Sequence, residues 1–406
     1  MKERTIEDIN KKIESGNANI FTAEEFKELV RSGDEPSFEE IDVVTCGTCG
    51  VMSGTAAIFN LVVAEAGAFK RAKNIYLNGV PANVGPCPNE WLGSVDGIIY
   101  GTSHSKLDPS YGGGFLFKDL IKGEEISIEL EDIDGNIFKS STTLEEMGTS
   151  QIIGTRMAFK NYTAFVNPNE NEVSSIFNAI PLKGGLDLLT FSGCGDINPL
   201  QNDPNRNILK QSLNILLNGA PAMIIGEGTR SSKEKPNLMI TGDMHQMNNE
   251  YIGGFKTGEG PEVFNTVAIP LPVLNEDVYN NLLILNENIP LTVSDIAGRH
   301  HPLTETNYGD MWNNHDDRPV CNSEKCLFCE DGCLVEKRCP TKAVKRIINK
   351  NKKIAKLEFN ENDCYGCGMC AYSCIGEIFS INTGSVSLDI DSKKYDLDIV
   401  CRQSDK

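Results

Sequence analysis

Eight cysteines near the end of this 406-residue chain fall into two runs whose spacing suits metal-cluster chemistry. The second run, Cys364 to Cys374, has the spacing C-x2-C-x2-C-x3-C that is typical of thiolates binding [4Fe-4S] clusters in pairs. The first run, Cys326 to Cys339, is a stretched version with x3 and x5 as its last two gaps, and Pro340 follows it. In such a pair, three cysteines of each run hold one cluster and the fourth ligates the other.

This rule predicts two [4Fe-4S] clusters with defined ligands. One set is Cys326, Cys329, Cys333 and Cys374, and the other is Cys364, Cys367, Cys370 and Cys339. Zinc ribbons also use four thiolates and are the alternative, although eight cysteines with a Cys-Pro at a fourth position favour iron. Ile375 stands where a second Cys-Pro would place its proline. Each cluster moves one electron at a time, which implies a redox reaction elsewhere in the chain.

Four further cysteines lie in glycine-rich contexts: Cys46 and Cys49 in "TCGTCG", Cys87 in "VGPCPNEW", and Cys194 in "SGCGDINP". A buried cysteine packs as a small apolar side chain, so each of them could be structural. A thiol at the start of a helix is instead a stabilised thiolate and a nucleophile. These four could carry a persulfide, cycle through a disulfide, or hold a third metal centre. Cys321 and Cys401 are expected to be structural.

The elements that position these residues are predicted from apolar periodicity. Residues 41–50 favour a strand that runs into a glycine turn, and residues 54–67 favour a buried helix, so the Cys46–Cys49 motif would lie at a strand-to-helix junction. Two helices are expected in the first forty residues, the second opening with a capping box between Thr22 and Glu25. Strands are expected at 74–80 and 95–101, and a hairpin at 125–138.

A polar, turn-rich stretch at 313–319 separates these elements from the cysteine runs. We therefore predict an α/β (mixed α+β) main domain over residues 1–317 and a ferredoxin-like 2[4Fe-4S] domain with a C-terminal tail over 318–406. The net charge of −19 argues against a general affinity for nucleic acid or anionic membrane. The first residues lack the apolar core of a signal peptide, so we expect a cytoplasmic protein.

Several motifs resemble the archaeal homocysteine-biosynthesis family, the L-aspartate semialdehyde sulfurtransferases. They are "DVVTCGTCGVMSG", "NIYLNGVPANVG", "YGGGFLFKDLIKG", "NPLQNDP", "EGTR", "ITGDMHQMNNEYIGG" and "IPLPVLNEDV", in the family's order over roughly residues 1–310. With the second domain fused, the chain looks like the methanogenesis marker protein 16 branch. That resemblance implies a reductive sulfurtransferase that converts sulfoacetaldehyde to coenzyme M, with homocysteine formation from aspartate semialdehyde as the alternative.

The resemblance also implies partners: an aldehyde substrate, a sulfur donor and a low-potential electron donor, with a homodimer as one open arrangement. In the homocysteine-forming relatives a cysteine follows the Gly-x-Met turn, and this chain has Ser53 there. Another of their cysteines lies in the hairpin that corresponds to residues 132–143, where this chain has none. The sulfur-carrying residue therefore does not transfer by motif, and we expect Cys46 or Cys49 to take that role, with Cys87 and Cys194 next.

The chemistry needs an acid for the departing oxygen and a cation for the substrate's anionic group. His245 in "TGDMHQM" and His104 in "GTSHSK" are the acid candidates, His104 also as a substrate ligand, and Asp243 could orient either. Arg156 and Arg230 are the candidates for the sulfonate or carboxylate. Gly112 to Gly114 could present amides to an anion. A different class stays open: an iron–sulfur electron carrier or cluster-assembly protein.

Overall fold

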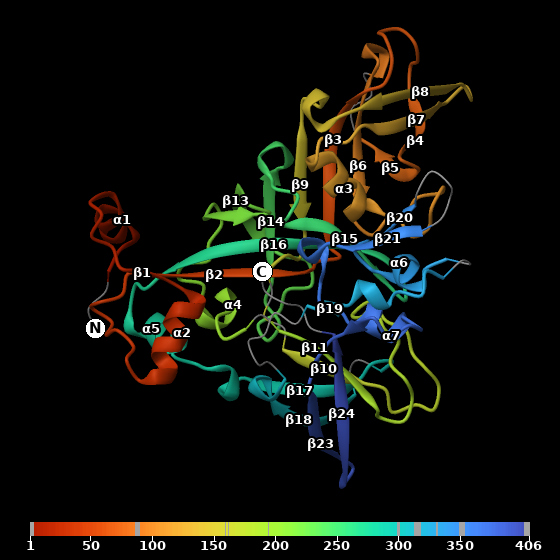
Figure 1. The fold of residues 1–406 in the computed structure, drawn as a ribbon. Helices are drawn as coiled ribbons and strands as arrows, with labels where there is room; N and C mark the ends of the chain where they lie inside the picture. Colours follow the sequence, from red (N-terminus) through yellow and green to blue (C-terminus); the bar gives the residue numbers. More distant parts are fainter. Residues whose placement is uncertain are drawn as a thin grey trace.

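Strands dominate the fold. The computed structural model describes residues 4–85, 90–158, 160, 162–193, 195–298, 301–311, 318–329, 332–348 and 354–401. These residues form a long, mostly antiparallel sheet and a smaller six-stranded sheet, with short helices at their edges (Figure 1). The predicted mixture of helices and strands is confirmed.

The large sheet has fourteen strands in the order β1-β2-β16-β12-β13-β14-β9-β3-β6-β5-β4-β7-β8, with β15 paired to β16. Their bounds are β1 Ile20–Thr22, β2 Val43–Val51, β3 Thr55–Val62, β4 Ala72–Leu77, β5 Val80–Val84, β6 Ser94–Tyr100, β7 Ile126–Asp132, β8 Ile137–Thr142, β9 Ser150–Gly154, β12 Asn214–Leu217, β13 Ala220–Glu227, β14 Leu238–Asp243, β15 Ile252–Thr257 and β16 Gly260–Pro272.

The small sheet has the order β18-β17-β10-β11-β24-β23. Its strands are β10 Thr163–Val166, β11 Leu188–Ser192, β17 Pro290–Asp295, β18 Pro302–Asn307, β23 Ser385–Ile390 and β24 Lys393–Cys401. Two short ribbons complete the strands: β19 Val320–Cys321 with β22 Phe379–Ser380, and β20 Val344–Ile348 with β21 Ile354–Phe359.

The α-helices are short. They are α1 Ile6–Glu14, α2 Ala23–Ser32, α3 Gly113–Ile121, α4 Pro199–Asn202, α5 Glu276–Leu282, α6 Leu334–Arg338 and α7 Met369–Ser373. Within the described ranges, no helix is long and apolar enough to cross a bilayer.

The predicted helix at residues 54–67 is wrong, because this segment contains strand β3. Burial alternates along β3 with a period of two, so that Ala57, Phe59 and Leu61 are buried while their neighbours are less so. A short apolar run fits either a buried helix or a strand, and pairing with β6 and β9 on its two edges decides for the strand. The expected strand-to-helix junction beside the first two cysteines therefore does not exist.

Other local predictions are confirmed. The side chain of Thr22 accepts a hydrogen bond from the Glu25 amide at the start of α2, and the Glu25 carboxylate accepts from the Thr22 amide. Strands β7 and β8 form the expected hairpin, and Gly135 in its turn has a φ of 87°, a conformation that glycine adopts without strain. Strands β4 and β6 occupy the two predicted strand segments.

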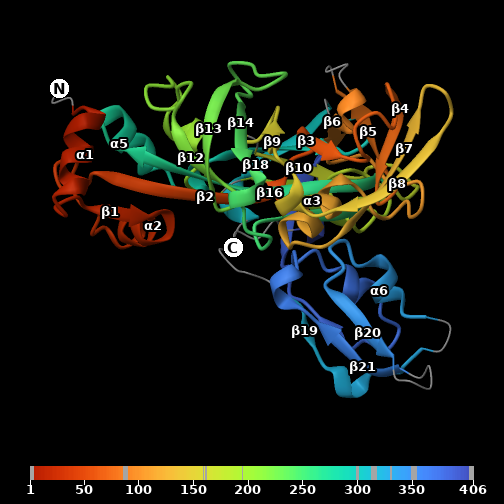
Figure 2. The same ribbon diagram turned by 90° about the horizontal axis from the view of Figure 1, so that it is seen from above.

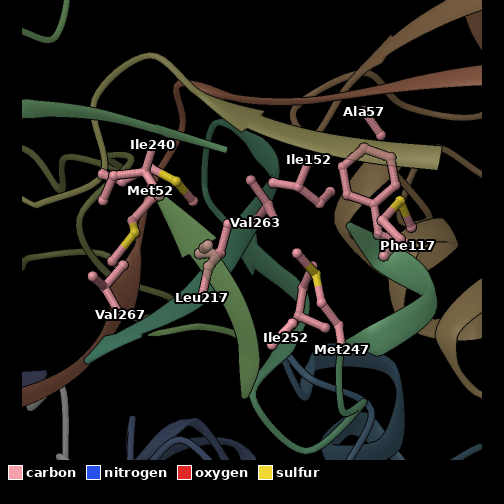
Figure 3. Packing of buried hydrophobic residues seen from close by; sticks show 14 of the residues in the cluster. Met52, Ala57, Phe117, Ile152, Leu217, Ile240, Met247, Ile252, Val263 and Val267 are labelled. Atoms are coloured by element: carbon pink, nitrogen blue, oxygen red, sulfur yellow. The ribbon is translucent and has the colours of Figure 1, made fainter. Parts of the chain in front are cut away.

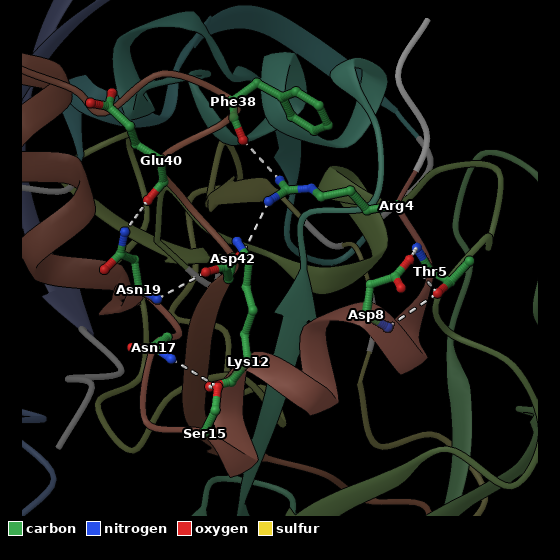
Figure 4. A network of polar contacts seen from close by, with 10 residues as sticks. All are labelled: Arg4, Thr5, Asp8, Lys12, Ser15, Asn17, Asn19, Phe38, Glu40 and Asp42. Carbon is green, nitrogen blue, oxygen red and sulfur yellow. Dashed lines mark hydrogen bonds and ion pairs between the residues drawn. The ribbon is translucent and has the colours of Figure 1, made fainter.

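A buried carboxylate anchors the first helices to the start of β2. Asp42 is fully buried and accepts hydrogen bonds from Arg4 at 3.0 Å, from Lys12 at 2.6 Å and from the Asn19 amide at 2.9 Å (Figure 4). Arg4 also donates to the carbonyl of Phe38 at 2.8 Å. Since a buried charge is costly unless it is paired, this network holds together the segment that leads into the first cysteine motif.

The main apolar core packs against one face of the large sheet. Met52, Ile152, Leu217, Val263 and Val267 meet there from strands that are far apart in the sequence (Figure 3). Phe117 brings α3 into the same core. These contacts fix β2, β9 and β16 relative to one another, and β2 and β16 border the candidate site.

The cysteine-rich segment projects from the side of the two sheets (Figure 2). It begins after β18 and ends before β23, and β24 then pairs in parallel with β11. Both ends of the segment therefore lead into the small sheet, and the last two strands complete a sheet begun before residue 318. The domain division at residue 317 and the ferredoxin-like fold stay predictions.

Candidate active site and thiolate sets

A cavity of about 90 Å³ lies where β2 and β16 meet the end of β11. Its wall is mostly apolar, with hydroxyl, thiol and amide groups but no carboxylate among the described lining residues. The lining residues are Cys46, Thr48, Gly50, Val51, Met52, Ser53, Met157, Ala158, Ile176, Phe177, Ser192, Gly193, Asn198, Pro199, Val267 and Ile269.

Cys46 and Cys49 lie inside β2 rather than in the predicted turn. Successive side chains of a strand point to opposite faces, so residues three apart are on opposite sides. Cys46 lines the cavity, and its Sγ donates to the carbonyl of Ile197 at 3.0 Å. Cys49 faces the other way, where its Sγ lies 3.0 Å from the hydroxyl of Tyr365. The two thiols are both buried but belong to different environments.

Cys87 and Cys194 lie outside the described residues, so the structure places neither thiol. The neighbours of Cys194 are described, and Ser192 and Gly193 line the cavity. The Gly195 amide donates to the Tyr308 hydroxyl at 3.2 Å, and the Tyr162 hydroxyl donates to the Gly195 carbonyl at 2.9 Å. Two tyrosines, of which Tyr308 is fully buried, therefore hold Gly195 in place.

Arg156 and Arg230 lie near enough for their charges to interact, although 74 positions separate them in the sequence, and Arg230 is exposed. Arg156 precedes two lining residues, Met157 and Ala158, and its backbone packs on Gly54. Burial lowers the pKa of Arg156, and the charge of Arg230 lowers it further. The Nε of Arg156 is buried without a hydrogen-bond partner, and neither guanidinium has an ion pair within the part of the chain that the structure describes.

The structure brings neither candidate histidine to this cavity. The Nδ1 of His245 lies 2.8 Å from Asp243, and its Nε2 lies 3.0 Å from each of the carbonyls of Leu144 and Met147. Both ring nitrogens thus join β14 to the segment before β9. His104 is exposed and forms an isolated bridge with Gly112.

The glycines at the start of α3 serve packing. The amide of Gly113 donates to the Ser103 carbonyl at 2.8 Å, and that of Gly114 donates to the Gly101 carbonyl at 3.0 Å. A Cβ on Gly113 would lie 2.3 Å from the Tyr100 carbonyl oxygen. The expectation that these two amides present themselves to an anion is wrong.

A buried acid near the cavity was not among the sequence predictions. Glu262 in β16 is 6% exposed, and its Oε2 has no partner among the described atoms. Burial raises the pKa of Glu262, and hydrogen bonds from the Ser53 side chain and the Val263 amide lower it by less. Ser53 lines the cavity, which connects the acid to the site. The available signal was that Glu262 is the only charged residue in the thirteen-residue strand β16.

The structure brings together the four cysteines of one predicted set and three of the four in the other. Cys326, Cys329, Cys333 and Cys374 line one apolar cavity together. Cys339 and Cys364 lie close enough to Cys370 that, after burial, their charges contribute to raising its pKa to about 12. Backbone amides donate to ligand sulfurs, from Ala343 to Cys339 at 3.2 Å and from Gly366 to Cys364 at 3.4 Å.

These sets fit [4Fe-4S] clusters in ligand type, number and burial. A cluster spreads its four thiolates over four iron atoms, whereas a single ion needs them around one point.

The fold and cavity define a class of protein: a mixed α/β chain in which a buried thiol faces an apolar pocket flanked by paired arginines. More particularly, the chain belongs to the family described as "Homocysteine biosynthesis enzyme, sulfur-incorporation", whose model matches residues 18–406. This confirms the family that the motifs indicated. The branch within it stays a prediction.

Two relatives match nearly the whole chain. An uncharacterized protein of Methanothermobacter thermautotrophicus is 49% identical over 404 residues, 100% of this chain and 90% of the relative. Another, from Methanocaldococcus jannaschii, is 43% identical over 392 residues, 95% of this chain and 93% of its own length. An L-aspartate semialdehyde sulfurtransferase of M. jannaschii is 30% identical over 324 residues, 75% of this chain and 62% of that enzyme. No solved structure matches.

Proposed function

We propose that this protein is a reductive sulfurtransferase that converts sulfoacetaldehyde to coenzyme M. Membership of a sulfur-incorporating family supports the reaction class. The observation that carries the substrate is Arg156, whose charge interacts with that of Arg230 and which directly precedes two lining residues of a cavity whose described lining has no carboxylate. Two unpaired guanidinium groups suit the oxygens of a sulfonate, which accepts several hydrogen bonds and needs no anion next to it.

Cys46 is the sulfur carrier in this proposal. Its thiol lines the cavity, whereas that of Cys49 points away from it. A persulfide on Cys46 attacks the aldehyde carbon, forming a C–S bond while the carbonyl oxygen becomes an alkoxide. Cleavage of the S–S bond takes two electrons and two protons and returns the Cys46 thiol together with a thiohemiacetal.

Loss of water from the thiohemiacetal leaves a thiocarbonyl, and two further electrons and protons give the thiol. The total is four electrons when sulfur arrives as a persulfide, and two when it arrives as sulfide. The departing oxygen needs a proton. Ser53 lines the cavity and is hydrogen-bonded to Glu262, whose pKa is raised by burial, which makes its carboxyl group the candidate proton donor.

Clusters bound by the two cysteine sets would supply the electrons. Thiolates of the cysteine-rich segment would hold the two clusters, and bound clusters supply electrons one at a time. A low-potential donor outside the chain must reload them. The protein's own contribution is to hold the substrate anion, orient the aldehyde against Cys46 and keep the reaction in an apolar cavity that excludes competing water.

Homocysteine formation from L-aspartate semialdehyde is the second candidate. It is favoured by the names of the relatives at 28% and 30% identity, from Methanosarcina acetivorans and M. jannaschii, although the match spans 63% and 62% of their lengths. That substrate carries an ammonium group, which a carboxylate in the pocket would pair. The cavity offers none among its described lining residues.

An anaerobic competition assay tests the proposal. The purified protein receives sulfide, a strong reductant and both aldehydes at equal concentration, and the thiol products are separated by mass. Coenzyme M should dominate by about 10⁴-fold, because polar groups matched to one substrate reject an analogue that leaves them unpaired. Homocysteine as the main product would reverse the choice of substrate. No thiol from either aldehyde would favour the electron-carrier or cluster-assembly class.

A further inference from the structure

The cysteine-rich segment is held against the main fold by a specific interface. The Nζ of Lys118 in α3 lies 2.5 Å from Asp363, the residue before Cys364. The Lys256 amide in β15 donates to the Pro340 carbonyl at 3.0 Å, directly after Cys339. The Lys256 ammonium also donates to the Lys337 carbonyl at 3.0 Å. Each of these contacts lies beside a ligand of the same predicted cluster.

A single aromatic side chain joins that cluster's binding loop to the first cysteine motif. Tyr365 lies between Cys364 and Cys367 in the sequence and is 6% exposed. Its ring packs on Phe264 at 4.5 Å and on Phe255 at 5.4 Å between centroids, and its hydroxyl lies 3.0 Å from the Sγ of Cys49. Cys49, Tyr365 and Cys367 belong to one buried cluster of side chains.

This buried cluster reaches the candidate active site. Val51 and Phe177 pack against it and also line the cavity. Cys49 itself lies in β2, three residues from Cys46, which opens into the cavity. A short, buried connection therefore runs from the Cys364–Cys367 loop to the cavity that Cys46 lines, and it is covalent except for the contact between the Tyr365 hydroxyl and the Cys49 Sγ.

The other thiolate set lies at the outside. Cys326, Cys329, Cys333 and Cys374 are all only partly buried, whereas in the other set Cys339, Cys364 and Cys367 are buried and Cys370 alone is partly buried. Exposed apolar residues lie next to the outer set: Leu327 is 63% exposed and Ile375 is 72% exposed. Surroundings of this kind suit entry of electrons from an external donor.

We propose that Tyr365 and Cys49 form the electron-transfer contact between the cysteine-rich segment and the active site, so that the two thiolate sets act in a fixed order. The outer set, Cys326, Cys329, Cys333 and Cys374, receives electrons from a low-potential protein donor. The inner set, Cys339, Cys364, Cys367 and Cys370, passes them on at Tyr365. Neither Tyr365 nor Cys49 touches the substrate, so both are positioning residues, and this order rests on the proposed function.

The electrons and protons of this transfer balance as follows. A cluster held by the inner set would lose one electron in each transfer and the sulfur adduct would gain it, while no bond of Tyr365 or Cys49 changes. Two transfers, with two protons taken up in the cavity, complete each reductive step. The hydroxyl of Tyr365 and the thiol of Cys49 lower the barrier by keeping the two buried surfaces in contact.

The test compares Tyr365→Phe with Tyr372→Phe in the full-length, reconstituted protein. Tyr372 lies between two ligands of the same run but is 46% exposed, which makes it the matched control. Both variants should keep the iron content of the parent. After reduction with dithionite and mixing with sulfide and sulfoacetaldehyde, reoxidation of the clusters should slow about tenfold in Tyr365→Phe and stay unchanged in Tyr372→Phe.

A spectroscopic readout works without turnover. In Tyr365→Phe and in Cys49→Ala, the midpoint potential of only one of the two clusters should shift in a redox titration followed by electron paramagnetic resonance. Cys329→Ser removes an outer ligand and should leave that shifted signal intact, whereas Cys367→Ser should abolish it. If Tyr365→Phe changes neither a potential nor the reoxidation rate, or if the shifted signal is the one lost in Cys329→Ser, the proposed contact is refuted. If no aldehyde reoxidises the clusters of the unmodified protein, the proposed function is contradicted. The redox titration would still show whether Tyr365 and Cys49 contact one of the clusters.

Discussion

Cys46 and Cys49 point to opposite faces of strand β2, one into the cavity and the other onto Tyr365. A Cys-x-x-Cys pair in a turn or at a helix start can close into a disulfide, but in an extended strand the same spacing separates the two thiols. The motif therefore divides two tasks between two cysteines instead of joining them in one redox pair.

Replacing Cys46 and replacing Cys49 should have different effects on activity. Cys46→Ser should abolish thiol formation and also the binding of one sulfur atom that intact-protein mass analysis detects after incubation with a sulfur donor. Cys49→Ser should still bind that sulfur but form product slowly. A Cys46→Ser protein that keeps full activity would shift the sulfur-carrying role to Cys194 or Cys87.

Arg156→Ala should weaken substrate binding. Hydrogen bonds to charged groups contribute about 1.5–3 kcal/mol, so kcat/KM should fall roughly tenfold to a hundredfold, mainly through KM. Arg206→Ala is the control, because Arg206 is already paired with Glu227. Equal losses in both variants would mean that Arg156 supports the fold and does not hold the anion.

Glu262→Gln should stabilise the protein at neutral pH while lowering turnover. Burial raises the pKa of Glu262, so the ionised carboxylate destabilises the folded state once the pH exceeds the unfolded pKa, and glutamine removes that cost. Stability due to this group is complete below the unfolded pKa and is lost as the pH rises through the folded pKa. The stabilising effect of the glutamine should therefore vanish in acid, as denaturant titrations across pH would show. A stability difference independent of pH would contradict the assigned protonation.

Gly193→Ala should disturb the cavity wall. A Cβ there would lie 2.1 Å from the ring of Tyr308, which is fully buried and cannot move aside. Overpacking of this kind costs about 1–3 kcal/mol. Gly148→Ala is the control, since a Cβ at Gly148 meets nothing within 4 Å. Thermal unfolding of both variants measures the difference, and an equal melting temperature would show that the ring can yield.

Anaerobic reconstitution should load about eight iron atoms per chain, as two [4Fe-4S] clusters require. Changing one ligand of each set, Cys329→Ser and Cys367→Ser, should reduce the iron content by about half in each case. Zinc in place of iron, or loss of all iron in both variants, would contradict two separate sets.

Local signals in the sequence were sufficient for some elements. The capping box of Thr22 and Glu25 and the Asp134–Gly135 turn each depend on a few neighbouring residues, and both were predicted correctly. Strand β3 was predicted as a helix because its apolar run fits either structure, and the choice depends on β6 and β9, which lie far along the chain. Local propensity cannot report such partners.

The site residues likewise divide into those that the sequence indicates and those that only the fold reveals. The two cysteine runs reveal their grouping through spacing alone, since covalent distance limits where their thiols can go. Arg156 and Arg230 could be named as candidates, but their meeting depends on β9 and the segment after β13 lying together. The roles of Glu262 and Tyr365 arise from burial and from contacts across the fold. No short motif contains that information.

The placement of the last two strands has a consequence for how the chain is made. Strand β24 pairs with β11, more than 190 residues earlier, and the cysteine-rich segment lies between them in the sequence. During synthesis the N-terminal parts fold first. One edge of β11 therefore stays unpaired until all eight cysteines of the two predicted sets have left the ribosome. Closing that edge then fixes both ends of the segment and shortens the loop that its own folding must close. Completion of the sheet is therefore the last step of assembly, and a chain that stops before residue 385 would expose an open strand edge to aggregation and degradation.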